Sequence, residues 1–145
     1  MRPSSGPLIA AALVAGFINV ASLVLPWFDI VGRPRSSIDI LRSASALDVI
    51  EGSLKIVVVG AWLLAPILVA GAMLLGAAGR HKLAAALLLP VGLFTLFAVG
   101  AGLFIDEVGV VWGALLGLVS ALLASILAIM VLMTPRSVQT ASVQK

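Results

Sequence analysis

Long apolar runs separated by short polar segments dominate the pattern of this 145-residue chain. Four runs stand out, at residues 7–25, 56–78, 83–104 and 108–133. A helix needs about 20 predominantly apolar residues to cross the ~30 Å hydrocarbon core of a bilayer, and each run meets that length. The pattern therefore predicts an all-α integral membrane protein built as a four-helix transmembrane bundle.

The segment 26–55 is the only sizeable polar piece between two runs. Within it, Ser36 and Asp39 have the spacing of a capping box, in which each side chain accepts a hydrogen bond from the other residue's backbone N–H. We expect a short helix over about residues 37–50, or a loop, between the first and second spans. Residues 134–145 form a polar tail, and residues 1–145 are expected to form a single transmembrane domain.

Composition agrees with a membrane location. Hydrophobic residues make up 62% of the chain, so too few polar residues remain to cover the surface of a soluble protein. The absence of cysteine excludes thiol chemistry and disulfides. The net charge is +3, but the nine basic residues are scattered and form no stripe, so no nucleic-acid partner is expected.

The charges of the short turns predict the orientation. The turn at residues 79–82 has basic residues and no acid, whereas the turn at 106–107 has two acids and no base. Because basic residues are enriched on the cytoplasmic side of membranes, we expect both termini and the basic turn in the cytoplasm. The 26–55 segment then faces outward, although its four basic residues run against the rule.

Small residues recur at every fourth position of the last run. Such a stripe lets two helix backbones approach closely in lipid, where helix association depends on packing. The stripe packs either on the chain's own helices or on a partner, and the spacing does not decide between them. Its members are Gly109, Gly113, Gly117, Ala121 and Ser125.

Asn19 is the only strongly polar side chain well inside a predicted span. A buried amide needs a hydrogen-bond partner, and the sequence offers Ser22, Thr95, Ser120 and Ser125. Asn19 is interpreted as a pin between helices, with a substrate contact as the alternative.

Two prolines lie near the middle of neighbouring spans. Pro66 and Pro90 each remove a backbone hydrogen bond, so we expect both helices to kink there. Kinks at similar depth would open space between the two helices.

Aromatic residues mark the outward ends of the spans. Trp27 and Phe28 follow the first run, and Trp112 lies near the start of the last one. Because Trp is enriched at membrane–water interfaces, these three residues are predicted interface anchors. Trp62 lies on the same side of the second run, where stacking on a lipid or quinone headgroup is an alternative to anchoring.

Groups that support catalysis are missing from the spans. Every carboxylate lies outside the four runs, and the single histidine, His81, lies in the basic turn. The sequence has no spacing typical of a metal site or a phosphate-binding loop. We therefore expect no enzymatic activity, no cofactor and no metal.

Two local motifs give the chain a resemblance. Leu25-Pro26-Trp27 follows the first run, and Gly79-Arg80-His81-Lys82 joins the second to the third. In these features the chain resembles the small four-span inner-membrane proteins of high-GC actinobacteria. The resemblance implies a multi-pass protein of the bacterial plasma membrane. Some similar proteins are accessory subunits of respiratory or cell-envelope complexes.

Two functions fit these observations. The first is a non-enzymatic accessory or scaffold subunit of a larger membrane complex, with lipids and other integral membrane subunits as partners. The alternative is a small homodimeric transporter or lipid-binding membrane protein. That alternative predicts a polar or lipid-filled cavity near Pro66 and Pro90.

Overall fold

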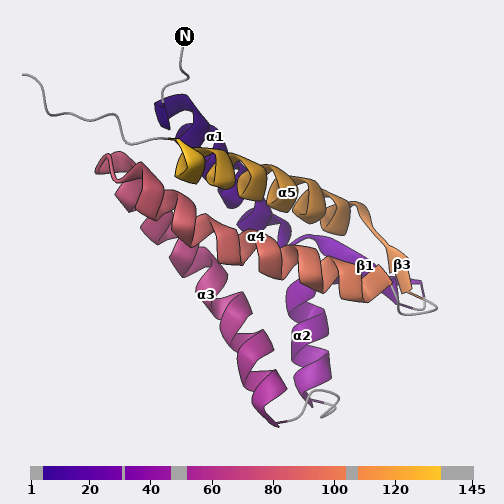
Figure 1. Ribbon diagram of the computed structural model, residues 1–145. Helices are drawn as coiled ribbons and strands as arrows, with labels where there is room; N and C mark the ends of the chain where they lie inside the picture. The colour runs from indigo at the N-terminus through magenta and orange to yellow at the C-terminus, as the bar shows by residue number, and fades with distance from the viewer. Residues whose placement is uncertain (1–4, 31, 47–51, 104–107, 135–145) are drawn as a thin grey trace, which may run out of the picture.

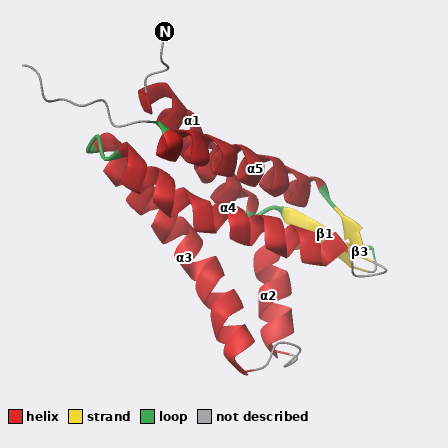
Figure 2. Cartoon of the chain, viewed as in Figure 1, coloured by secondary structure: helices red, strands yellow, loops and turns green. Residues whose placement is uncertain are grey.

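The computed structural model describes residues 5–30, 32–46, 52–103 and 108–134, which form five helices and three short strands (Figures 1 and 2). In chain order these are α1 (Ser5–Ser22), β1 (Pro26–Ile30), β2 (Arg33–Ser36), α2 (Ser37–Ala46), α3 (Gly52–Ala77), α4 (His81–Leu103), β3 (Val108–Val110) and α5 (Trp112–Met133).

Three of the helices, α3, α4 and α5, contain apolar segments long enough to cross a membrane. The helix α1 is apolar but shorter. Its 18 residues extend about 27 Å at ~1.5 Å per residue, slightly less than a ~30 Å hydrocarbon core. The chain is therefore mostly helical with three helices able to span a bilayer, rather than an established bundle of four.

The helices pack around α1, α4 and α5, which lie side by side (Figure 1). The helix α3 meets α4 at their connecting turn and then diverges from it, so that α2 runs beside the N-terminal half of α3. The strands lie at the end of α4 and α5 opposite that turn (Figure 2). The bundle thus has a closely packed part and a splayed part.

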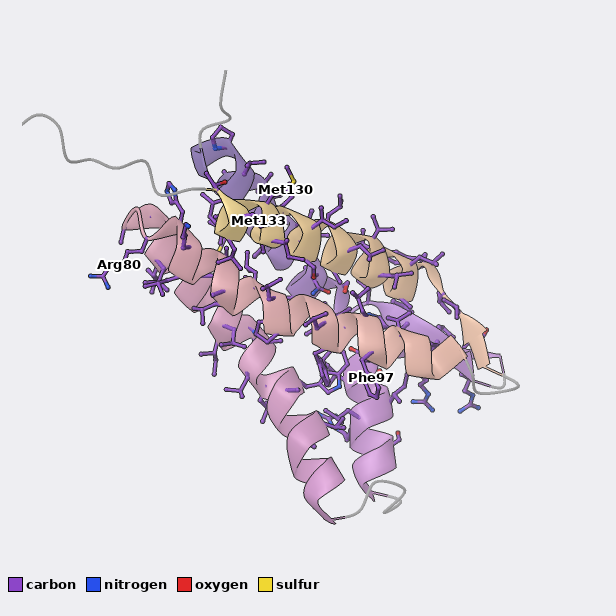
Figure 3. The ribbon with its side chains drawn as sticks, in the orientation of Figure 1. Arg80, Phe97, Met130 and Met133 are labelled. Carbon is purple, nitrogen blue, oxygen red and sulfur yellow. The ribbon has the colours of Figure 1, made fainter. Side chains whose placement is uncertain are left out.

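Small residues fill the interfaces between the helices, and large apolar residues cover the outside of the bundle. Phe97, Met130 and Met133 all project from the helix surface (Figure 3). Soluble proteins place such residues mainly inside, whereas helices in lipid pack through small side chains. The distribution fits helices surrounded by lipid. Buried alanines include Ala12, Ala65, Ala72, Ala84, Ala85, Ala114, Ala124 and Ala128.

The small-residue stripe of α5 faces other elements of the same chain. Gly113, Gly117, Ala121 and Ser125 are all buried. A Cβ atom at Gly113 would overlap the carbonyl oxygen of Pro26 in β1, and one at Gly117 would lie 2.8 Å from Ser22 Oγ of α1. The missing side chains therefore allow α1 and β1 to contact the α5 backbone.

Gly109 does not belong to this stripe. The predicted start of the last helix at Val108 is wrong, because Val108–Val110 forms β3 and α5 begins at Trp112. Gly109 is exposed and pairs with Asp29 of β1. Its place is in the sheet, outside any helix interface.

The all-α expectation is also wrong, because the strands form an antiparallel sheet in the order β2-β1-β3. The central strand β1 pairs Phe28 with Arg35 on one side and with Val110 on the other. The strands have only three to five residues, so they leave no recognisable strand pattern in the sequence. The residues of β3 are apolar and continuous with the last apolar run, which is why the sequence assigned them to a helix.

The predicted capping box at the start of α2 is confirmed. The Asp39 backbone N–H donates to Ser36 Oγ at 3.1 Å, and the Ser36 backbone N–H donates to Asp39 Oδ2 at 3.3 Å. The helix ends at Ala46, and the remainder of the predicted helix, 47–50, lies outside the described residues.

The Gly113→Leu variant should destabilise the fold. Its side chain would meet the backbone of β1, which yields less readily than a side chain, so we expect a loss of about 1–3 kcal/mol or more. Thermal unfolding in mild detergent, followed by circular dichroism, measures the change. Leu115→Ala, at an exposed position of α5, is the control and should leave the midpoint nearly unchanged. Equal effects of the two variants would contradict the packing described for the stripe.

Candidate functional site

The C-terminal end of α1 is closed by backbone N–H groups of residues 23–25 and by side chains. The last carbonyls of a helix have no partner within the helix, and lipid offers them none. Ser22 Oγ donates to the Asn19 carbonyl at 2.6 Å, Trp27 Nε1 donates to the Ser22 carbonyl at 2.7 Å, and Ser37 Oγ donates to the Leu23 carbonyl at 2.5 Å. These bonds attach β1 and α2 to the end of α1.

Trp27 reaches this position through an irregularity of β1. The pairing of β1 with β2 shifts register between Pro26 and Phe28, as at a β-bulge. A bulge redirects a side chain, and here both Trp27 (1% exposed) and Phe28 (8% exposed) are buried. Both side chains therefore pack inside the chain, and their predicted role as interface anchors stays a prediction. Trp112 is 56% exposed, and its role as an anchor stays a prediction.

Asn19 connects α1 to α4. Its Nδ2 donates to Thr95 Oγ1 at 3.1 Å, and Thr95 Oγ1 donates to the Val91 carbonyl at 3.1 Å. One of the expected partners of Asn19 is thus confirmed. The other amide atom, Oδ1, is buried with no hydrogen-bond partner in the described part of the chain, as is Ser125 Oγ. Asn19 has the contact expected of a pin between helices.

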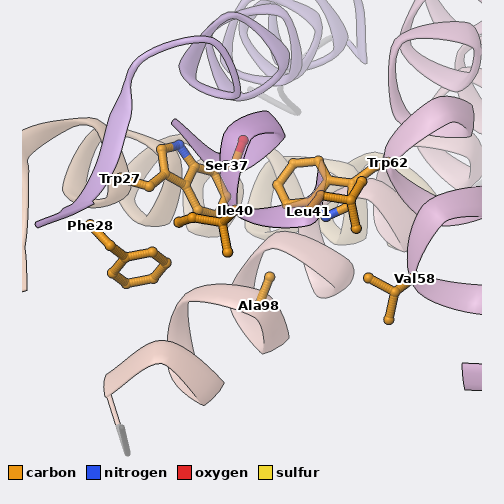
Figure 4. A pocket seen from close by; sticks show the side chains of 8 residues that line it. All are labelled: Trp27, Phe28, Ser37, Ile40, Leu41, Val58, Trp62 and Ala98. Atoms are coloured by element: carbon orange, nitrogen blue, oxygen red, sulfur yellow. The ribbon is translucent and has the colours of Figure 1, made fainter. Parts of the chain in front are cut away.

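An aromatic pocket lies between the sheet, α2, α3 and α4 (Figure 4). Its volume is about 130 Å³, comparable to the ~150 Å³ cavities that admit a benzene-sized molecule. The lining is apolar apart from Ser37 and the indole N–H groups. The residues that line it are Trp27, Phe28, Ser37, Ile40, Leu41, Val58, Trp62 and Ala98.

Edge-to-face aromatic contacts hold one wall of this aromatic pocket. The rings of Trp27 and Trp62 lie 5.2 Å apart, and Trp62 lies 5.3 Å from Phe94. Phe28 continues the series at 6.3 Å from Trp27. Each aromatic pair of this kind contributes about 0.5–1.5 kcal/mol to stability beyond the burial of its apolar area. The series connects β1, α3 and α4, because its rings come from these three elements.

Charged residues lie beside the aromatic pocket on β2 and α2. The hydrogen bonds from the Ser36 side chain and backbone lower the pKa of Asp39, and the nearby Arg35 and Arg42 act in the same direction. A lowered folded-state pKa means that the capping box stabilises α2 fully above the ordinary Asp value of 3.8. That stabilisation is lost as the pH falls through the folded-state pKa. Asp39 is therefore ionised at neutral pH.

A second hollow is an apolar groove between α1 and α5, with a volume of about 390 Å³. The only polar side chain in its lining, Ser120, donates its hydroxyl to the Leu116 carbonyl at 2.7 Å. The groove therefore offers shape and apolar surface. Its residues are Ala11, Val14, Ala15 and Ile18 of α1 and Leu116, Val119, Ser120, Leu123 and Leu127 of α5.

The prolines lie away from both hollows. Pro66 and Pro90 lie within α3 and α4 and are exposed at the surface, and neither lines the aromatic pocket or the α1–α5 groove. Asn19 also lines neither the aromatic pocket nor the α1–α5 groove. The aromatic pocket and the α1–α5 groove thus contain none of these three residues, which the sequence suggested as parts of one cavity.

Sequence reasoning missed the pocket as a unit. Ser37, Val58 and Ala98 come from three elements and have no shared spacing, so only the tertiary fold brings them together. One signal was available, because the capping box fixes the start of α2. No group of three or more metal-ligating side chains occurs within residues 5–30, 32–46, 52–103 and 108–134.

Comparison of the chain with models of protein families, with curated proteins and with solved structures finds no match.

Removing the Trp27 donor should weaken the fold. Trp27→Phe keeps an aromatic ring but removes one of the two donors to the Ser22 carbonyl, which keeps the Leu25 backbone N–H at 3.0 Å. The loss of one buried hydrogen bond should cost about 0.5–1.5 kcal/mol. The measurement is the free energy of unfolding in mixed micelles. Trp112→Phe is the matched control on the exposed surface and should change it little. A larger effect of the control would show that the bond to Ser22 has no special importance.

Asn19 and Thr95 should be energetically coupled. A double-mutant cycle with Asn19→Ala and Thr95→Val isolates their bond, for which we expect about 0.6–2 kcal/mol. Additive effects of the two substitutions would mean that the contact contributes nothing to stability.

Proposed function

We propose that this chain is a non-enzymatic accessory or scaffold subunit of a larger membrane complex in the bacterial plasma membrane. The observation that carries the proposal is the α1–α5 groove, an apolar hollow on the outer surface of the best-packed pair of helices. In this proposal, a transmembrane helix of another subunit lies in the groove.

The groove has the composition that helix association in lipid favours. Ala11 and Ala15, four residues apart on α1, form its floor and allow close approach of another backbone. Val14, Val119 and Leu123 form rims with 50–59% of their surface exposed. Apolar contact alone does not favour a helix over a lipid as the occupant of the groove, because both are apolar. In this proposal the shape of the groove selects the partner helix.

The polar groups of the bundle support a binding role over catalysis. Ser22, Thr95 and Ser120 all donate their hydroxyls to backbone carbonyls. Trp27 Nε1 does the same. These donors are used by the fold itself, so the proposal assigns them no part in a reaction.

The proposed topology has four crossings with both termini in the cytoplasm. The helix α1, extended by the turn that follows it, supplies the fourth crossing. The N-terminal end of α1, the α3–α4 turn and the C-terminal end of α5 lie at one end of the bundle (Figure 1). Arg80 and Lys82 at that end support a cytoplasmic location.

The alternative remains a small homodimeric transporter or lipid-binding membrane protein. The transporter version has less support, because the prolines line neither hollow. The lipid-binding version has one specific observation in its favour, the aromatic pocket beside α2.

Site-specific cross-linking tests the groove. The chain has no cysteine, so single substitutions at Val14→Cys or Leu123→Cys can each carry a photo-reactive label in an otherwise unreactive chain. In native membranes we expect both positions to cross-link to one partner chain. Leu64→Cys and Leu74→Cys, at exposed positions of α3, are the controls and should give no such product.

Ala11→Leu provides a second test, since Ala11 lines the groove and is exposed, so that the larger side chain fills the groove without entering the packed interior. It should abolish the cross-link while leaving helix content unchanged, and Ala86→Leu, on the exposed face of α4, should not. Identical cross-linking from α3 and from the groove would contradict the proposal. Products of twice the chain's mass from both groove positions would favour the homodimer instead.

A further inference from the structure

The aromatic pocket accepts hydrocarbon and little else. The Ser37 hydroxyl donates its hydrogen bond to the Leu23 carbonyl, and Trp27 Nε1 donates to the Ser22 carbonyl, so neither donor is available to an occupant. The remaining lining atoms from Phe28, Ile40 and their neighbours are apolar. An occupant that entered with a polar group would lose its hydration without gaining a partner in the depth of the pocket.

One donor of the lining stays available. Trp62 is half-buried, and its Nε1 makes no hydrogen bond to any residue that the structure describes. Its indole ring lies against Trp27 and Phe94, so its orientation is fixed by two edge-to-face contacts. An indole N–H group held in this way can donate to an ester or phosphate oxygen of an occupant.

The charges beside the pocket are predominantly basic. Arg35 pairs with Phe28 across β1 and β2, so the two side chains stand on the same face of the sheet, and Phe28 lines the pocket. Arg42 follows Leu41, another lining residue, on α2. Both arginines lie close enough to Asp39 to lower the pKa of its carboxyl group. The three elements β1, β2 and α2 together carry Arg33, Arg35 and Arg42 against Asp29 and Asp39, which is a net charge of +1 on this side of the pocket.

The pocket also lies where a lipid can reach it. Val58 and Trp62 belong to α3 and Ala98 to α4, the two helices of the splayed part, and both are long enough to span a bilayer. The opposite walls come from the sheet and α2, which lie beyond the end of α1. The pocket therefore lies between two helices that can span a bilayer and the elements that carry Arg35 and Arg42.

We infer that the aromatic pocket binds one anionic phospholipid. A short segment of one acyl chain, of the size that about 130 Å³ admits, lies between Trp62, Ile40 and Ala98, and the phosphate lies beside Arg35 and Arg42. This inference is independent of the partner complex proposed above, because the α1–α5 groove shares no residue with the pocket.

Tryptophan quenching by brominated lipids tests this inference. The Trp112→Phe background leaves Trp27 and Trp62, both in the pocket, as the only indoles. The full chain is reconstituted in phosphatidylcholine vesicles that contain increasing fractions of brominated phosphatidylglycerol or, separately, brominated phosphatidylcholine. We expect phosphatidylglycerol to compete at least about five-fold better, the preference that one basic residue near an anionic headgroup supplies.

Two variants and a control distinguish this site from bulk lipid. Arg35→Gln with Arg42→Gln changes two exposed side chains and should reduce the preference to about one. Ala98→Leu fills the pocket and should reduce quenching by both lipids, whereas Ala86→Leu on the exposed face of α4 should reproduce the parent. Circular dichroism of each variant checks that the helices form.

Three results would overturn the inference. Equal quenching by the two lipids in the parent would show that no anionic lipid is selected. A preference that survives the arginine substitutions would place the headgroup elsewhere. Unquenched indoles in every lipid, together with dimers that Ala98→Leu dissociates, would show that a second copy of the chain fills the pocket. Failure of the α1–α5 groove to cross-link to a partner would not alter the lipid preference, its dependence on the two arginines or the quenching of the indoles. The two proposals can therefore fail independently.

Discussion

The structure depends on how the end of α1 is closed. A helix that ends within or near hydrocarbon leaves carbonyl groups that lipid cannot hydrate. Here the backbone N–H groups of residues 23–25 bond the carbonyls of residues 20–22, and Trp27 and Ser37 add donors from β1 and from the first residue of α2. Because the two donors come from different elements, satisfying one helix end also fixes where the sheet and α2 lie. The aromatic pocket exists only because these elements are held there.

The second determinant is the close approach of backbones in the packed part of the bundle. The stripe on α5 admits β1 at Gly113 and α1 at Gly117. A Cβ atom at Gly92 of α4 would overlap Ser125 Oγ, so α4 and α5 are also in intimate contact. Packing of this kind replaces the hydrophobic effect, which has no force between helices in lipid. The large side chains are consequently left exposed on the outside of the bundle.

Much of the helical part could be predicted from the sequence, because an apolar run of about 20 residues is typical of a helix that crosses a membrane. The capping box of Ser36 and Asp39 and the partner of Asn19 could be predicted as well, since both follow from local spacing or from a short list of polar residues. The sheet could not, because Pro26, Trp27 and Phe28 fit a helix end and an interfacial aromatic pair equally well. A register shift in β1 decided between these structures, and it has no signature in the sequence.

The candidate site was harder to predict for the same reason. Trp62 was visible as an aromatic residue on the outward side of a span, but its neighbours Ile40 and Ala98 belong to separate elements. Pro66 and Pro90 had the stronger sequence signal and yet lie on the outer surface. In a bundle whose interior is made of small residues, a hollow forms where elements diverge, and divergence depends on tertiary contacts such as those at the end of α1.

Binding to another membrane subunit is central to the role proposed for this chain. Native mass spectrometry of the tagged chain, released from its own membranes in mild detergent, tests that role most directly. We expect a complex of fixed stoichiometry that contains at least one other integral membrane chain. Recovery of the chain alone, as a stable monomer, across detergents that preserve other membrane complexes would contradict the proposed role.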